Sequence, residues 1–143
     1  MRTKRELLYA WLLATLPLSG IPSTVYALLT GGDPLEATRA AADMLLSSES
    51  SLIRMLLAAT LVHASVSLFW SIVLWLALPR RRTMLWALLA SAAIALVDLR
   101  VIAPAFFPEV AALAFWPQFT DHLMWGACYS VGLSLGRPRA TRP

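Results

Sequence analysis

The sequence predicts an all-α membrane protein of four transmembrane helices, with both termini on the cytoplasmic side. Apolar residues make up 59% of the 143 residues and charged residues 14%, against about 45–50% and 25% in soluble domains. A chain of this size cannot bury so much apolar surface in one soluble core. Residues 7–32 and 55–79 also exceed the roughly 18 residues that mark a candidate membrane span.

The four predicted spans are residues 7–29, 52–78, 84–103 and 117–136. The first begins like a signal peptide, but its apolar stretch is too long and ends in no A-x-A cleavage site, so we expect it to be retained. Pro17, Gly20 and Pro22 predict a kink or local unwinding near mid-membrane. Pro104 is expected to end the third span. The fourth span has 20 residues, about 30 Å, if Pro117 occupies its first turn.

A short interfacial helix is predicted at residues 34–46, in the loop after the first span. Asp33 suits the N-cap, Pro34 the first helical position and Glu36 a capping box. The segment is mildly amphipathic, which is typical of a helix lying on the membrane surface.

The basic residues predict the orientation. Nine of the twelve lie in three juxtamembrane clusters, Arg2/Lys4/Arg5, Arg80/Arg81/Arg82 and Arg137/Arg139/Arg142. Four spans bring all three clusters to one face, which the positive-inside rule assigns to the cytoplasm. We therefore expect a multi-pass protein of the bacterial cytoplasmic (inner) membrane, with the lipid bilayer as its surroundings. No aromatic-and-basic recognition surface accompanies the charge, which argues against nucleic-acid binding.

Ionisable residues within the spans are the candidates for function, because such groups are costly in hydrocarbon. The candidates for handling a proton or small ligand are His63, Asp98, Asp121 and His122, with Ser67 and Trp125 beside them. The alternative is structural: a neutral His63 that ties two helices together, and rim ion pairs that join Arg100 to Asp121 or Asp98 to Arg54.

Small residues predict where helices pack closely. Gly126, Ser130 and Ser134 recur every four residues in the last span, and Gly132 begins a G-x-x-x-G motif. Such stripes let helices approach closely, either within the bundle or between protomers.

No catalytic motif is present, which favours a role other than catalysis, and no cofactor is predicted. Two histidines could ligate a haem, but their expected depths differ; a metal site would need His63, His122 and an aspartate without a ligand-spacing signature. A redox or metal protein is therefore the least favoured class.

Residues 55–136 resemble the YagU-like family of small bacterial inner-membrane proteins. The resemblance rests on Val62-His63-Ala64-Ser65-Val66-Ser67, the short basic turn, the proline-punctuated aromatic loop and Asp121-His122-Leu123-Met124-Trp125. It implies that His63, His122 and Trp125 belong to a common site, and it implies no particular activity.

Two functions remain open at this point. In the first, the helices enclose a polar cavity open to the periplasm that handles protons or a small polar ligand, within a monomer or a homo-oligomeric permeation unit. In the second, the protein is a non-catalytic accessory or assembly subunit of a larger membrane complex, and its polar residues only hold helices together.

Overall fold

The computed structural model describes residues 2–46 and 51–137, and it has only helices among them, so the predicted all-α class is confirmed. Two helical segments are long and apolar enough to cross a membrane: α4 (Leu52–Ala77) and the segment Thr83–Phe106. The first predicted span adds a third if its two arms, which are bent by 41°, count as one.

The first predicted span is broken at its middle. It consists of α1 (Lys4–Thr15), the 3-10 turn η1 (Pro17–Gly20) and α2 (Ile21–Thr30). Pro17 lacks an amide donor and disfavours a helical conformation in the residue before it, and Leu16 is indeed extended, with ψ 152°. The predicted interruption at Pro17 is therefore present, and it leaves the beginning of α2 inside the helical bundle.

The third predicted span continues past the proline that was expected to end it. It consists of α5 (Thr83–Val97), the π-helical turn η2 (Asp98–Ile102) and α6 (Ala103–Phe106). The Ala103 amide donates to the Asp98 carbonyl, five residues back. This wide turn places Pro104 in the first turn of α6, where a missing amide costs little. The prediction that Pro104 ends the helix was wrong for that reason.

The last helix, α8 (Phe115–Leu135), follows the short α7 (Pro108–Ala111) and has Pro117 in its first turn. Its 21 residues correspond to about 31 Å. It is not among the segments apolar enough to be identified as spans. The reason lies in its first half, which carries Gln118, Thr120, Asp121 and His122.

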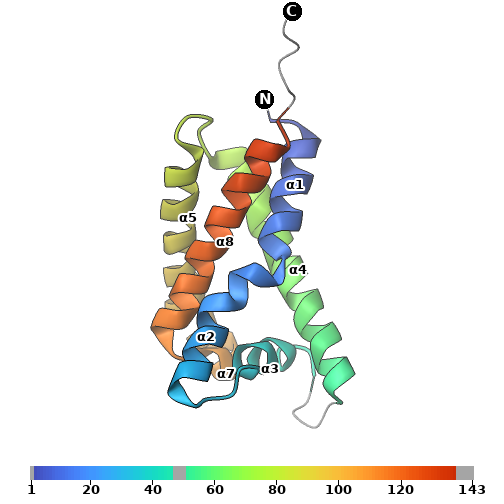
Figure 1. The fold of residues 1–143 in the computed structure, drawn as a ribbon, viewed down its shortest axis with the longest axis vertical. Helices are drawn as coiled ribbons and strands as arrows, with labels where there is room; N and C mark the ends of the chain where they lie inside the picture. The colour runs from blue at the N-terminus through green and yellow to red at the C-terminus, as the bar shows by residue number, and fades with distance from the viewer. Residues whose placement is uncertain (1, 47–50, 138–143) are drawn as a thin grey trace, which may run out of the picture.

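Figure 1 shows α1, α8 and α5 running along one another, with the start of α1 and the end of α8 at the same end. The core between them and α4 is formed by Ala10, Ala14, Leu74, Ala87, Ile94, Trp125, Tyr129 and Leu133. At the opposite end, α3 (Glu36–Ala42) lies across the bundle, and Ala42 packs on Met55, Ala58 and Ala59 of α4 (Figure 1).

The helix α3 is shorter than the predicted residues 34–46. The Asp33 carboxylate accepts a hydrogen bond from the Leu35 amide at 2.9 Å and pairs with Arg39. These contacts stabilise a turn before the helix, so α3 begins at Glu36. The Leu35 amide and the Arg39 guanidinium both lower the pKa of Asp33 below its usual value.

The small residues of α8 pack within the bundle. A Cβ atom on Gly126 would collide with Ser91 of α5 and lie 3.0 Å from the Ala87 carbonyl oxygen. A Cβ on Gly132 would lie 2.5 Å from the Ala10 Cα atom, in the backbone of α1. Ser130 is buried, whereas Ser134 is exposed and bonds to the Ser130 carbonyl. The glycines therefore allow contacts between helices of one chain.

Candidate functional site

Asp121 of α8 faces the beginning of α2. Its Oδ1 atom accepts a hydrogen bond of 3.0 Å from the Ser23 amide. Ser23 is the third residue of α2, so its amide has no partner within that helix. The first amides of a helix and its dipole both favour a negative charge at this position. The break in the first span thus provides a partner for a carboxylate inside the bundle.

His122, the next residue, is held between a backbone carbonyl and a second carboxylate. Its Nδ1 atom lies 2.8 Å from the Gln118 carbonyl oxygen, and its Nε2 atom lies 3.5 Å from Oδ2 of Asp98. A carbonyl can only accept, so Nδ1 carries a proton. Protonation at Nε2 then makes an imidazolium facing the Asp98 carboxylate. The pair can therefore gain or lose one proton at a defined atom.

Asp98 reaches His122 from the π-helical turn η2, which Asp98 begins. Single π-helical turns occur frequently at functional sites, because they change the direction of one side chain within a continuous helix. The side chains of Asp98 and His122 are 21% and 25% exposed, so the pair is mostly but not completely covered by other protein groups.

His63 belongs to a separate contact. Its Nε2 atom lies 3.4 Å from Oγ of Ser19, a buried residue of η1, whereas His63 itself is exposed. None of the hydrogen bonds or ion pairs described for the chain joins His63 to His122. His122 follows Asp121, which bonds to Ser23 just after the same break. The two histidines therefore lie near the same helix break, with different partners.

Ser67 and Trp125 hold helices together. Trp125 Nε1 donates to Ser67 Oγ at 2.9 Å, and Thr15 Oγ1 donates to the same oxygen at 3.0 Å. One turn further along, the Tyr129 hydroxyl donates to the Ser71 carbonyl at 3.0 Å. These bonds join α1, α4 and α8 through their buried faces. They favour a structural role for this part of the predicted ligand site.

The two suggested ion pairs do not form among the described residues, where Asp98 instead faces His122 and Asp121 accepts from Ser23. Arg100 is exposed, and its guanidinium carbon lies 4.1 Å from the centre of the Phe115 ring. Arg54 is exposed in the first turn of α4. The aspartates have other partners because the helix break presents the Ser23 amide to Asp121 and the π-helical turn places Asp98 beside His122.

The contacts of Asp121 and His122 adjoin a small hollow of about 20 Å³, lined in part by Ser23 and Gln118. This volume suits a single water molecule. Within residues 2–46 and 51–137, no three histidine, cysteine or acidic side chains lie close enough together to hold a metal ion.

A buried acid at the other end of the bundle was missed by the sequence analysis. Glu6 is 1% exposed and lies 3.5 Å from Arg80 and 3.8 Å from Arg137. It also forms a capping box with Thr3, whose amide donates to it at 2.6 Å. The signal was available, because Thr3-Lys4-Arg5-Glu6 is the S/T-x-x-E pattern that precedes an apolar run. Ionisable groups therefore pack against protein at both ends of the bundle: Glu6 is buried at one end, and Asp98, Asp121 and His122 are partly buried at the other.

No family model, curated protein or solved structure matches the chain. The fold and its apolar helices define the class: an all-helical protein with two or three segments able to cross a membrane. The resemblance to the YagU-like family stays a prediction.

Proposed function

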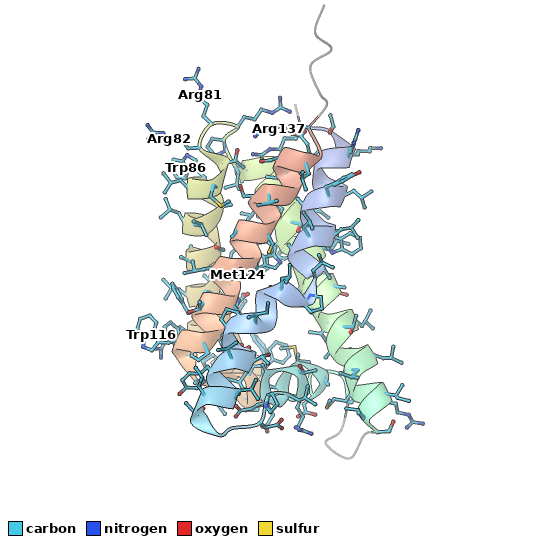
Figure 2. The ribbon with its side chains drawn as sticks, in the orientation of Figure 1. Arg81, Arg82, Trp86, Trp116, Met124 and Arg137 are labelled. Carbon is cyan, nitrogen blue, oxygen red and sulfur yellow. The ribbon has the colours of Figure 1, made fainter. Side chains whose placement is uncertain are left out.

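We propose that the protein spans the bacterial cytoplasmic membrane four times, with both termini in the cytoplasm and α8 as the fourth span. The distribution of side chains supports this topology. Arg81, Arg82 and Arg137 lie at the end where α1 begins (Figure 2). Trp86 lies near that end and Trp116 near the opposite end, as expected for residues at the two membrane interfaces (Figure 2). The polar first half of α8 is accommodated because Asp121 and His122 face protein groups.

Single cysteines test this topology. We expect that Glu109→Cys, in a Cys128→Ser background, reacts with a membrane-impermeant maleimide in intact cells, and that Arg81→Cys reacts only after lysis. Both replaced residues are exposed, so their reactivity reports sidedness. Labelling of both variants in intact cells, or the reverse pattern, would contradict the proposed orientation.

Within this topology, the protein handles protons at the helix break in the first span. The observation that carries this proposal is the His122 imidazole, which has Gln118 on one nitrogen and the Asp98 carboxylate on the other. Asp121 adds a second carboxylate, held by the N-terminus of a broken helix; in membrane transporters such helix ends face anionic groups at the binding site. Non-helical backbone at membrane depth is tolerated where it packs on protein or lines a cavity. His63, bonded to Ser19 beside the same break, is the second proton-accepting group.

Proton flux into liposomes tests the proposed activity. We expect His122→Ala to lower the flux by at least about 100-fold, the lower bound for removing a proton-transferring group. His63→Ala should lower it to a smaller extent, because its partner is a hydroxyl rather than a carboxylate. Asp98→Asn tests the carboxylate, and Glu109→Gln is its matched control, since Glu109 is exposed in α7 and does not line the hollow beside the site. Equal flux in wild type, His122→Ala and His63→Ala would refute proton handling.

The second candidate is a non-catalytic accessory or assembly subunit, and the Thr15–Ser67–Trp125 network favours it. That network uses two of the predicted ligand-site residues to join helices. This candidate predicts that His122→Ala and Asp98→Asn reduce the yield of folded protein in detergent without a change in flux per folded molecule. It also predicts that the wild-type protein co-purifies with a larger membrane complex.

A further inference from the structure

A groove of about 380 Å³ lies at the arginine-rich end, between the start of α5 and the end of α8. Three arginines line it: Arg80, Arg82 and Arg137. Figure 2 shows Arg82 and Arg137 at the end of the bundle opposite Trp116, and none of the proton-handling residues lines the groove. The groove is therefore separate from the site to which we assign the proposed function.

Two of the three arginines of the groove are held in place by the buried Glu6. Arg80 and Arg137 contact its two carboxylate oxygens, at 3.5 and 3.8 Å. Arg137 also donates to Thr83 Oγ1 at 3.1 Å, so it bridges α1, α5 and α8. Glu6 places one negative charge beside the three positive charges of the groove. An anion entering the groove would meet guanidinium groups that are already positioned, which lowers the entropy cost of binding it.

The first turn of α5 adds further attraction for an anion. No side chain caps this helix. The first backbone hydrogen bond described along it is donated by the Trp86 amide to the Arg82 carbonyl. The preceding amides and the positive end of the helix dipole therefore lie beside the arginines. Thr83 and Met84, from this turn, line the groove.

The rest of the groove contains three apolar side chains among hydroxyl groups. Met84, Val131 and Leu135 are exposed in its lining, beside the hydroxyls of Ser130 and Ser134. A free phosphate would leave these side chains uncovered, whereas the first acyl carbons of a phospholipid would cover them. Basic pockets between transmembrane helices bind anionic headgroups in this way. We propose that the groove binds an anionic phospholipid of the surrounding leaflet, with its phosphate among the arginines and its acyl chains on Met84, Val131 and Leu135.

The test is native mass spectrometry of the purified chain in non-ionic detergent, titrated with phosphatidylglycerol, phosphatidylcholine or inorganic phosphate. We expect phosphatidylglycerol to bind more tightly than phosphatidylcholine. Arg82→Gln should weaken phosphatidylglycerol binding about five-fold, the effect of one interfacial charge. Arg82 has no contact with Glu6 among the described ion pairs, so this variant keeps the Glu6 cluster.

Arg81→Gln is the matched control, because Arg81 lies in the same loop but does not line the groove. Figure 2 shows its side chain extending outward from the end of the bundle. Equal weakening by both variants would indicate general surface charge and overturn the site. Val131→Trp should block phosphatidylglycerol by filling the apolar lining while leaving every charge in place. Phosphatidylglycerol binding that survives Val131→Trp, or that inorganic phosphate displaces at similar concentration, would overturn the lipid as occupant.

Discussion

Replacing Gly132 with alanine is expected to lower the free energy of unfolding by about 3 kcal/mol, the upper part of the range for overpacked cores. The new methyl group would lie 2.5 Å from the Ala10 Cα atom, 2.7 Å from the Ala10 nitrogen and still closer to the Tyr9 carbonyl oxygen. All three atoms belong to the backbone of α1, so no side-chain rotation can relieve the collision. The helices α1 and α8 must separate, and the core around Ala10, Ala14 and Tyr129 loosens.

Gly20→Ala is the control, since it makes the same chemical change at a position where an added Cβ meets no atom within 4 Å. We expect it to be neutral or to stabilise by up to about 1 kcal/mol. Unfolding by a denaturing detergent, followed by circular dichroism, measures both variants. If Gly132→Ala left stability unchanged but altered the oligomeric state, the glycine would lie between protomers and the intramolecular contact would be wrong.

The helices were predictable from composition because the hydrocarbon of a membrane demands long apolar helical segments. The break in the first span was predictable as well, since Pro17 excludes a helical conformation at Leu16. The continuation of the helix past Pro104 was not predictable. It depends on the π-helical turn from Asp98 to Ile102, and the sequence analysis found no local pattern that predicts such a turn.

The sequence identified three residues of the candidate site, but it did not identify their partners, and it also included Ser67 and Trp125, which join helices instead. His122, Asp98 and Asp121 follow from the cost of ionisable groups in hydrocarbon. Their contacts depend on how the helices are oriented about their axes and on which amides the helix break leaves without a helical partner. The sequence therefore did not identify Ser23 and Gln118 as partners of the site. Glu6 is different, because its capping-box pattern was readable and only its burial was not.

That burial gives Glu6→Ala the second large expected effect, a loss of about 2–3 kcal/mol in the free energy of unfolding. Breaking a fully buried ion pair costs about 3–5 kcal/mol, but Arg80 and Arg137 are about half exposed and can regain water. This solvation reduces the electrostatic loss, as for surface pairs. The missing capping box adds about 1 kcal/mol, since the Thr3 amide loses its acceptor at 2.6 Å.

Glu6→Gln separates the two contributions, because glutamine can complete a capping box but carries no charge. We expect Glu6→Gln to lower the free energy of unfolding less than Glu6→Ala does. The difference between the two variants should be close to the capping contribution. Glu36→Ala is the control: it removes an exposed glutamate from the first turn of α3 and should change stability by less than about 0.5 kcal/mol. If Glu6→Ala cost no more than Glu36→Ala, Glu6 would not be holding α1, the α4–α5 loop and the end of α8 together. The arginines of the groove would then lack the fixed anchor that positions them for a lipid phosphate.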